Sequence, residues 1–341
     1  MKLRRLLLFS FLFTTLLSQA QKRIDSKQFF IDEEPVKATL NTDISTVINQ
    51  KMKPRPMKAV FKYTAPDSTV ITENITINAR GQFRRSECYM PPLKLDFHTD
   101  TTSPLYSLSS LKLVGPCRFT NNNEELLLKE YLVYKMYNLL TEKSFRVRLM
   151  ELTYEDSRGK RKPLTEYTFL IEDVDAMAKR NGCKEYENDK MLTEQTNRKQ
   201  MTLVALFQYM IGNTDWAVPH NHNIRLIRSR KDTLMPPYAV PYDFDYSGLV
   251  DAYYAIPAAE LGIEKVTDRL YRGFPRTTEE LEEAIALFNQ QKENIYSLIQ
   301  NFGLLSAKAK KNMIDYIDDF YKQINDKRSV RSVFIDKARQ F

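Results

Sequence analysis

The hydrophobic pattern of this chain changes period at residue 173, and that change limits the folds open to it. Before it, apolar and polar residues alternate in short stretches such as residues 75–80 and 145–152, as in half-buried strands. One long helical pattern, residues 124–140, interrupts them. After residue 173, apolar residues recur mainly at helical spacing. The sequence predicts an α+β, two-lobed fold: a β-rich N-terminal lobe with one helix, residues 21–172, and a helical C-terminal lobe, residues 173–341.

Several later segments support the helical lobe. Residues 193–211 carry apolar residues around the whole helix, which is typical of a buried helix. Helix-capping residues, Thr277 or Thr278 and then Ser306, precede two long amphipathic stretches. We expect both stretches to be helices that pack on the C-terminal lobe.

Residues 1–20 have the pattern of a cleavable export signal. Basic residues Lys2, Arg4 and Arg5 precede an apolar run of about 12 residues, and the small residue Ala20 follows. A membrane-spanning helix needs about 20 apolar residues, and no later stretch reaches that length. We therefore expect an exported protein, in the periplasm or outside the cell, without a membrane span after cleavage.

The charge of the chain does not indicate a nucleic-acid surface. The formal net charge is +8, and the basic runs at residues 158–162 and 228–231 lie between strand-like stretches. Such runs are most simply solvated turns, and an exported protein seldom meets nucleic acid. A protein partner is compatible with this composition, and oligomeric state is not indicated.

The three cysteines are too few for a disulfide scaffold in a chain of 341 residues. One bridge is compatible with an oxidising compartment. Cys88 and Cys117 flank neighbouring strand-like segments, so they are the favoured pair, with free buried thiols as the alternative.

The densest polar cluster lies at residues 212–223, after a buried helix and before a strand. The sequence Asp-Phe-Asp follows 20 residues later. If the two short strands between them pair as a hairpin, Asn223 and Asp243 arrive at the same end, and Asp215 reaches it from the preceding loop. Oxygen ligands of this kind suit Mg²⁺ or Mn²⁺ together with phosphate oxygens.

An Asp, a following Asn and a later Asp form the set that protein kinases use for phosphotransfer from ATP or another nucleotide. Here Asp215 would act on the acceptor hydroxyl, Asn223 and Asp243 would hold the metal, and Asp245 is a further metal candidate. The alternative is a polar loop that is only structural.

The strand-rich part offers matching phosphate-binding residues. Gly81 sits at a strand end, and Lys94 lies on the next strand, with Lys112 as a second candidate. Glu130 in the long helix is the favoured ion-pair partner of the lysine, and Glu125 is the rival. A kinase phosphate loop has several glycines, whereas this stretch has one.

Two other chemistries have weaker patterns. His220 and His222 with Asp215 resemble a zinc ligand set, but His98, the third histidine, is far away in sequence. A serine hydrolase is not indicated, because no G-x-S-x-G motif is present. Trp216, beside Asp215, is either a core residue or a pocket wall.

Several motifs resemble those of the spore-coat CotH-like family of atypical kinases, in particular its shorter envelope members from Bacteroidetes-like bacteria. The resemblance extends from about residue 75 to residue 273. It rests on ARG followed by PPLKLDF, LKLV, KEYLVYKMYNLL, FLIEDVD, GNTDW with HNHN, and PYDFDYSG.

The resemblance implies roles in the strand-rich part. Arg80 and Gly81 would lie at the nucleotide phosphates, and Lys94 would contact a phosphate. Residues 170–172, ending at Glu172, would form the hinge that binds adenine.

The resemblance also implies a kinase-like fold, with Asp215 as the catalytic carboxylate. Asn223 and Asp243 would hold the metal, with help from Asp245. Some family members phosphorylate Ser or Thr in proteins. The alternative function is a non-catalytic envelope protein of the same fold that binds a ligand or partner.

Overall fold

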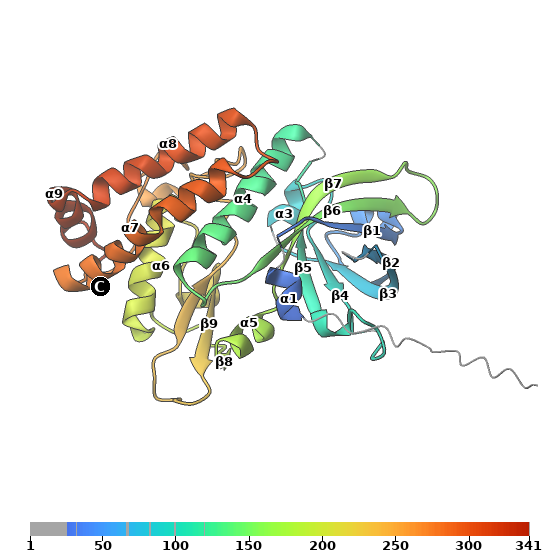
Figure 1. The fold of residues 1–341 in the computed structure, drawn as a ribbon, viewed down its shortest axis with the longest axis horizontal. Helices are drawn as coiled ribbons and strands as arrows, with labels where there is room; N and C mark the ends of the chain where they lie inside the picture. Colours follow the sequence, from blue (N-terminus) through green and yellow to red (C-terminus); the bar gives the residue numbers. More distant parts are fainter. Residues whose placement is uncertain are drawn as a thin grey trace, which may run out of the picture.

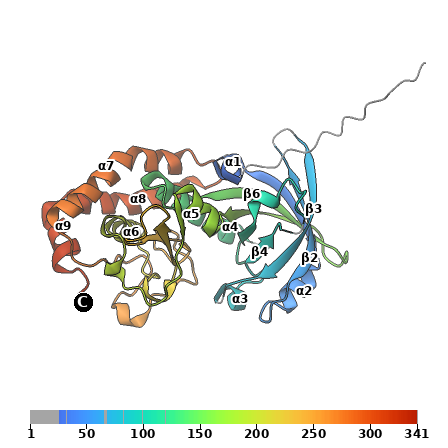
Figure 2. The same cartoon turned by 90° about the horizontal axis from the view of Figure 1, so that it is seen from below.

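A computed structural model of the chain describes residues 26–340 except residues 32, 66, 67, 82, 99 and 119. The predicted export signal, residues 1–20, lies outside the described residues. Most strands lie at one end of the molecule and the long helices of the second half at the other (Figure 1; Figure 2).

Seven strands form a closed barrel, in the order β1, β2, β3, β4, β5, β7, β6 and back to β1. Neighbouring strands are antiparallel except β1 and β6, which run parallel, with Val36 opposite Met150 and Thr42 opposite Asp156. The strands are Val36–Thr42 (β1), Met57–Thr64 (β2), Val70–Ala79 (β3), Leu93–Asp96 (β4), Ser110–Val114 (β5), Val147–Asp156 (β6) and Leu164–Ile171 (β7).

The predicted fold class, with a β-rich lobe that carries one helix, is therefore wrong. The strands close into a barrel, and short helices lie among them: Ser26–Ile31 (α1), Ile44–Asn49 (α2) and Phe83–Glu87 (α3). These helices have five or six residues, too few to show a helical period. Closure depends on β1 pairing with a distant strand, which a local pattern does not reveal.

Alternating side chains fill the barrel. In β1, Val36, Ala38 and Leu40 are buried, and the intervening residues are more exposed. The inward residues of the other strands, such as Phe61 and Leu95, join them in one apolar core.

The long helix Asn121–Leu140 (α4) belongs to a second core, shared with the C-terminal helices. It packs against β6 and β7 on one side and against helix Thr278–Gln300 (α7) on another. Because both sides are covered, its sequence is apolar around most of its circumference. The other elements of this half are Val174–Arg180 (α5), Cys183–Glu185 (β8), Arg198–Met210 (α6), Ile224–Ser229 (β9), Tyr238–Pro241 (β10), Ala307–Ile324 (α8) and Lys327–Arg331 (α9).

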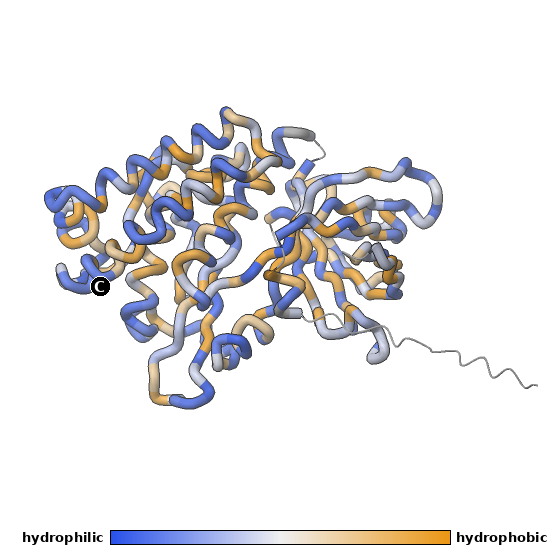
Figure 3. The backbone as a smooth tube through the Cα atoms, viewed as in Figure 1, coloured by the Kyte–Doolittle hydropathy of each residue, from blue (hydrophilic) through white to orange (hydrophobic). Residues whose placement is uncertain are grey.

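Helices α7 and α8 begin where their caps predict. The Thr277 hydroxyl accepts the backbone N–H of Glu280, and the Ser306 hydroxyl accepts that of Ala309. Figure 3 shows apolar and hydrophilic positions alternating along both helices, as expected when one side is buried.

Cys88 and Cys117 form a disulfide, as favoured from the sequence, and Cys183 is buried and free. The bridge joins the segment after α3 to the segment after β5. Among the described residues, no helix has both the length and the apolar character needed to cross a bilayer.

Candidate functional site

The predicted hairpin is present and brings Asn223 and Asp243 to one end. Strands β9 and β10 pair antiparallel, with Ile224 opposite Pro241. The Tyr242 backbone N–H then donates to the Asn223 carbonyl at 3.0 Å. Asn223 and Asp243 are therefore next to this last rung of the hairpin, as the sequence predicts.

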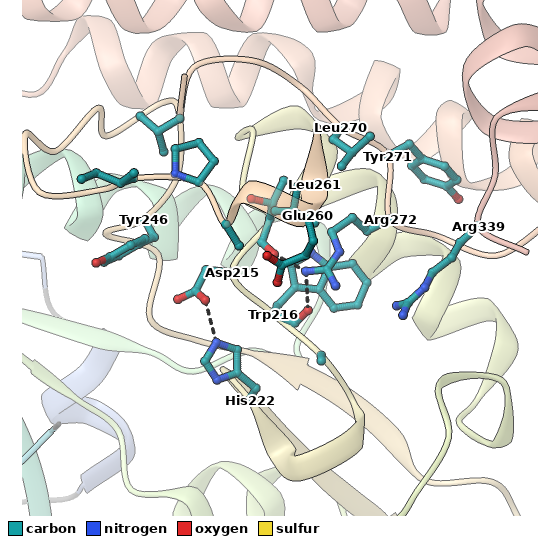
Figure 4. Close-up of a pocket in the computed structure, with 16 residues that line it drawn as sticks. Asp215, Trp216, His222, Tyr246, Glu260, Leu261, Leu270, Tyr271, Arg272 and Arg339 are labelled. Carbon is teal, nitrogen blue, oxygen red and sulfur yellow. Dashed lines mark hydrogen bonds and ion pairs between the residues drawn. The ribbon is translucent and has the colours of Figure 1, made fainter. Parts of the chain in front are cut away.

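Asp215 lies at the same end and is bonded to Asn223. The Asn223 Nδ2 donates to the Asp215 carbonyl at 2.8 Å and to its carboxylate Oδ2 at 2.9 Å. The other carboxylate oxygen is 2.6 Å from His222 Nε2 (Figure 4). The hydrogen bond to Asp215 raises the pKa of His222, although burial opposes it. Asp215 is thus held by two side chains while its carboxylate stays partly exposed.

The backbone around the site adopts conformations that most residues avoid. Four residues have left-handed φ angles: His220 (63°), Asn221 (50°), Asn223 (52°) and Asp243 (66°). Asn, Asp and His are the non-glycine residues most often found there. Backbone strain of this kind is concentrated at functional sites, so it marks this loop as a candidate.

Helix α4 contacts the Asp-Phe-Asp segment through Tyr134. The Asp243 backbone N–H donates to the Tyr134 hydroxyl at 2.8 Å. The Phe244 ring packs edge-on against Tyr134 with centroids 4.7 Å apart, and against Phe207 of α6 at 5.7 Å. These contacts fix Asp243 relative to the second core.

Asp245, two residues after Asp243, is buried, with 6% of its surface exposed. Burial and the charge of Asp243 raise the pKa of Asp245 to about 6, against the opposing effects of Arg84 and Tyr254. The Tyr254 hydroxyl donates to the Asp245 carboxylate at 2.9 Å. Glu130 is buried as well, and its burial together with the charge of Asp245 raises its pKa well above the usual value.

Arg84 of α3 supplies the positive charge in this buried cluster. Its guanidinium donates to the Gly115 carbonyl at 2.6 Å. Burial disfavours its charge, but the ionisable acidic groups around it raise its pKa overall. In order of effect these groups are Tyr254, Asp245, Glu130 and Asp243.

Lys112 is a half-buried lysine on β5 that is affected by the charge of Asp243. Burial and the charges of Arg80 and Arg225 lower the pKa of Lys112 to about 7, while Asp243 opposes the change. Its ammonium lies 4.3 Å from the Tyr242 ring centroid. Lys94 is directly opposite Lys112 on the neighbouring strand, hence on the same face, but it is exposed.

The structure does not pair either predicted glutamate with these lysines. Glu130 lies in the Arg84 cluster, and Glu125 forms an ion pair with Lys129 at 3.4 Å. Glu172 is buried and bonded to Arg180, with Nε at 2.9 Å from its Oε1. Its carboxylate is therefore committed to a bond within the protein.

Arg80 and Gly81 follow β3 at the edge of this region. The Arg80 backbone N–H donates to the Pro92 carbonyl at 2.9 Å, and its Nε is buried without a partner among the described residues. Gly81 has φ of 78°, and a Cβ there would meet no atom within 4 Å. A glycine at this position is explained by the positive φ angle and not by lack of space for a side chain.

The oxygen donors at the hairpin end fit a hard divalent cation. Both partners of the Asn223 Nδ2 are acceptors, so its amide oxygen must point away from them and is available as a ligand. Within the described residues the Asp243 carboxylate accepts no hydrogen bond and forms no ion pair. Mg²⁺ is commonly held by one or two carboxylates plus phosphate and water oxygens, so this small donor set is adequate.

Three residues that shape this site are not predicted from the sequence. Tyr134 fits the apolar pattern of its helix, and nothing nearby in the sequence indicates that its hydroxyl accepts a hydrogen bond from the Asp243 backbone. Arg84 lies in a helix too short to recognise. The sequence suggests His222 only as a zinc ligand, whereas in the structure it is hydrogen-bonded to Asp215. Its spacing from Asp215 across a polar loop is the signal that could have indicated this contact.

Comparisons with known proteins give little further guidance. No family model matches the sequence, and no curated protein matches it. Among solved structures, the crystal structure of the proinflammatory kinase CtkA from Helicobacter pylori aligns with a TM-score of 0.40 and 12% identity, over 71% of this chain and 92% of that chain. The resemblance to the CotH-like family thus rests on the sequence motifs, and the candidate site on its own geometry.

Proposed function

We propose that this protein transfers a phosphoryl group from ATP, or another nucleotide, to a hydroxyl group, with Mg²⁺ or Mn²⁺ as cofactor. The observation that carries the proposal is the convergence of Asp215, Asn223 and Asp243 at one end of the hairpin, with Lys112 of the barrel near enough to be affected by the charge of Asp243. Phosphotransfer requires a group that positions the hydroxyl and groups that neutralise the phosphates.

Each residue has a distinct role in this proposal. Lys112 and Arg80 would contact phosphate oxygens, with exposed Lys94 next to them on the same face. Asn223 and Asp243 would hold the cation, which when bound neutralises the phosphate charge. Asp215 would orient the acceptor hydroxyl.

In the proposed step the acceptor oxygen forms a bond to the terminal phosphorus, and the bond from that phosphorus to the bridging oxygen breaks. The nucleoside diphosphate leaves with the electron pair. The hydroxyl proton passes to Asp215 and from there to water. His222, bonded to the other oxygen of Asp215, keeps the carboxylate in place.

The test compares Asp243→Asn and Asp215→Asn with the wild-type protein. Asn keeps the size of the side chain and tolerates the left-handed backbone of Asp243, so folding should persist. We expect Asp243→Asn to abolish metal-dependent nucleotide binding in calorimetric titration. We expect Asp215→Asn to bind nucleotide normally and to lose about 100- to 10,000-fold in transfer rate, the usual contribution of a proton-transfer group.

Asp319→Asn, an exposed change on α8, is the matched control and should behave as the wild type. Thermal melts of all three variants establish that they are folded. A folded wild-type protein that binds no nucleotide with either metal would contradict the proposal.

A second candidate is ligand binding without transfer. It is favoured by one observation: the stretch after β3 carries the single glycine Gly81, whereas a kinase phosphate loop has several. In that case nucleotide binding would be equal with and without metal and insensitive to Asp243→Asn.

We also propose export to the periplasm or the extracellular space, followed by action on protein Ser or Thr residues. The Cys88–Cys117 disulfide supports the first part, since such bonds persist in oxidising compartments. Mass spectrometry of the N-terminus after expression in a secreting host would show whether cleavage follows Ala20.

A further inference from the structure

A cavity of about 700 Å³ is lined in part by Asp215 and His222, while Asn223 and the hairpin strands are not among its lining residues. Figure 4 shows Asp215 and His222 on one wall and Arg272 and Arg339 farther along. Its walls come from the Asp215 loop, from residues 256–272 and from the C-terminal segment. The candidate catalytic carboxylate is therefore accessible from a space large enough for several amino-acid residues.

One arginine of this cavity is fixed by the loop that carries Asp215. The Arg272 guanidinium donates to the carbonyls of Thr214 and Trp216, the second at 3.1 Å. It also lies over the Trp216 ring, 5.8 Å from the centroid. These bonds make Arg272 part of the wall.

The other arginine of the cavity, Arg339, is not bonded to this loop. Arg339 is exposed, and its guanidinium lies 5.5 Å from the Phe274 ring centroid. No carboxylate of the described residues forms an ion pair with it. Burial and the charge of Arg339 lower the pKa of Arg272, although Asp215 and Glu260 oppose this. The two guanidinium groups therefore repel each other, and an anion between them would relieve that repulsion.

The remaining wall carries Glu260 and several apolar residues, and the apolar part continues to the surface. Pro257, Leu261 and Leu270 line the cavity, and Ile256 at its edge is 76% exposed. Tyr253, nearby in sequence, is 56% exposed. A cavity with an open apolar edge and a fixed charge suits an extended polypeptide, whose side chains alternate in character.

We propose that this cavity binds the acceptor: a polypeptide segment whose hydroxyl group meets Asp215 and whose anionic side chain, a few residues away, pairs with Arg339. The inference rests on the proposed function and adds the class of substrate. The anion is a carboxylate of Asp or Glu or the phosphate of an already modified residue, and both present oxygens that a guanidinium binds in pairs.

The test measures peptide binding separately from transfer. Fluorescence anisotropy is recorded with a set of serine peptides that carry Glu, phosphoserine, Ala or Lys at each position within four residues of the acceptor serine. We expect Glu or phosphoserine at one position to bind about tenfold more tightly than Ala, the effect of one charged hydrogen bond. The comparison of the Glu and phosphoserine peptides identifies the source of the anion.

Arg339→Glu should reverse the preference so that Lys binds best at that position. Arg331→Glu, a charge reversal at an exposed residue of α9 outside the cavity, should leave the preference unchanged. If Arg339→Glu fails to fold, Arg339→Gln should remove the preference without reversing it. Equal binding of the Glu, Ala and Lys peptides to the wild type would overturn the inference.

Nucleotide binding, measured on the same samples, keeps the two proposals apart. Wild-type protein that binds and transfers phosphate but does not distinguish acidic from basic peptides refutes the acceptor inference alone. Protein that binds acidic peptides through Arg339 but no nucleotide refutes the proposed function alone.

Discussion

Glu124 at the start of α4 and Glu166 of β7 bring two carboxyl groups into contact beside the barrel. Burial, a hydrogen bond to Glu124 and the charge of Glu124 raise the pKa of Glu166 from 4.5 to about 7. The Tyr167 backbone N–H donates to Glu124 at 3.3 Å, which keeps Glu124 next to its neighbour. The folded protein therefore retains a proton on Glu166 at a pH where the unfolded chain has released it.

This retained proton predicts a dependence of stability on pH. The pKa of Glu166 is higher in the folded than in the unfolded state, so its contribution is complete below about pH 4.5 and is lost as pH rises through about 7. We expect Glu166→Gln to flatten the fall in melting temperature between pH 5 and pH 8, as measured by circular dichroism.

Glu282→Gln on the exposed side of α7 removes one carboxylate outside the pair and serves as the control. A Glu166→Gln variant whose melting temperature falls with pH as steeply as that of the wild type would contradict the expectation.

The two barrel lysines show how far sequence alone specifies a site residue. Both Lys94 and Lys112 were recognised on strands, and the structure places them opposite each other on one face. They differ in burial, since Lys94 is exposed, whereas Lys112 is half-buried and affected by the charge of Asp243. That difference depends on packing between segments more than a hundred residues apart, so no local pattern contains it.

At the scale of elements, α7 is the helix that joins the second core together, since it packs against α4, α6 and α8. Its start is fixed by a capping box, in which Thr277 and Glu280 satisfy each other's backbone N–H groups. We expect Thr277→Ala to lower the free energy of unfolding by about 1 kcal/mol, as measured by urea denaturation.

Thr278→Ala, one residue farther along in the first turn, removes the same atoms without removing the cap. It should change the free energy of unfolding by less than half as much. Equal effects of the two substitutions would show that the capping bond does not matter.

Elements with strong local signals were predictable, and those without were not. The hairpin of residues 224–241 and the helices after Thr277 and Ser306 appear where the pattern indicated them. The helices α1 to α3 and the closure of the barrel through β1 are not predicted. The β1 sequence does alternate over seven residues and pairs with the next strand, β2, but its second partner, β6, lies more than a hundred residues away in sequence.

For the molecule as a whole, the Cys88–Cys117 bridge is the covalent link between two segments that lie close to the buried Arg84 cluster. It closes a loop with a sequence separation of 29 residues. We expect the double substitution Cys88→Ser and Cys117→Ser to lower the free energy of unfolding by about 3–4 kcal/mol, the loop-entropy value for this length.

Wild-type protein in a reducing agent should reach the stability of the double variant, and the double variant should not respond to the reagent. A double variant as stable as the oxidised wild type would show that the bridge leaves the unfolded state unconstrained.

The parallel pairing of β1 with β6 has a consequence for the way the chain is made. A ribosome releases β1 long before β6, and Val36 cannot meet Met150 until the intervening strands and α4 have emerged. Until then β1 has one open edge, which is a site where chains can associate wrongly. A nascent chain halted after β5 would therefore expose this strand edge, whereas one halted after β7 could close it.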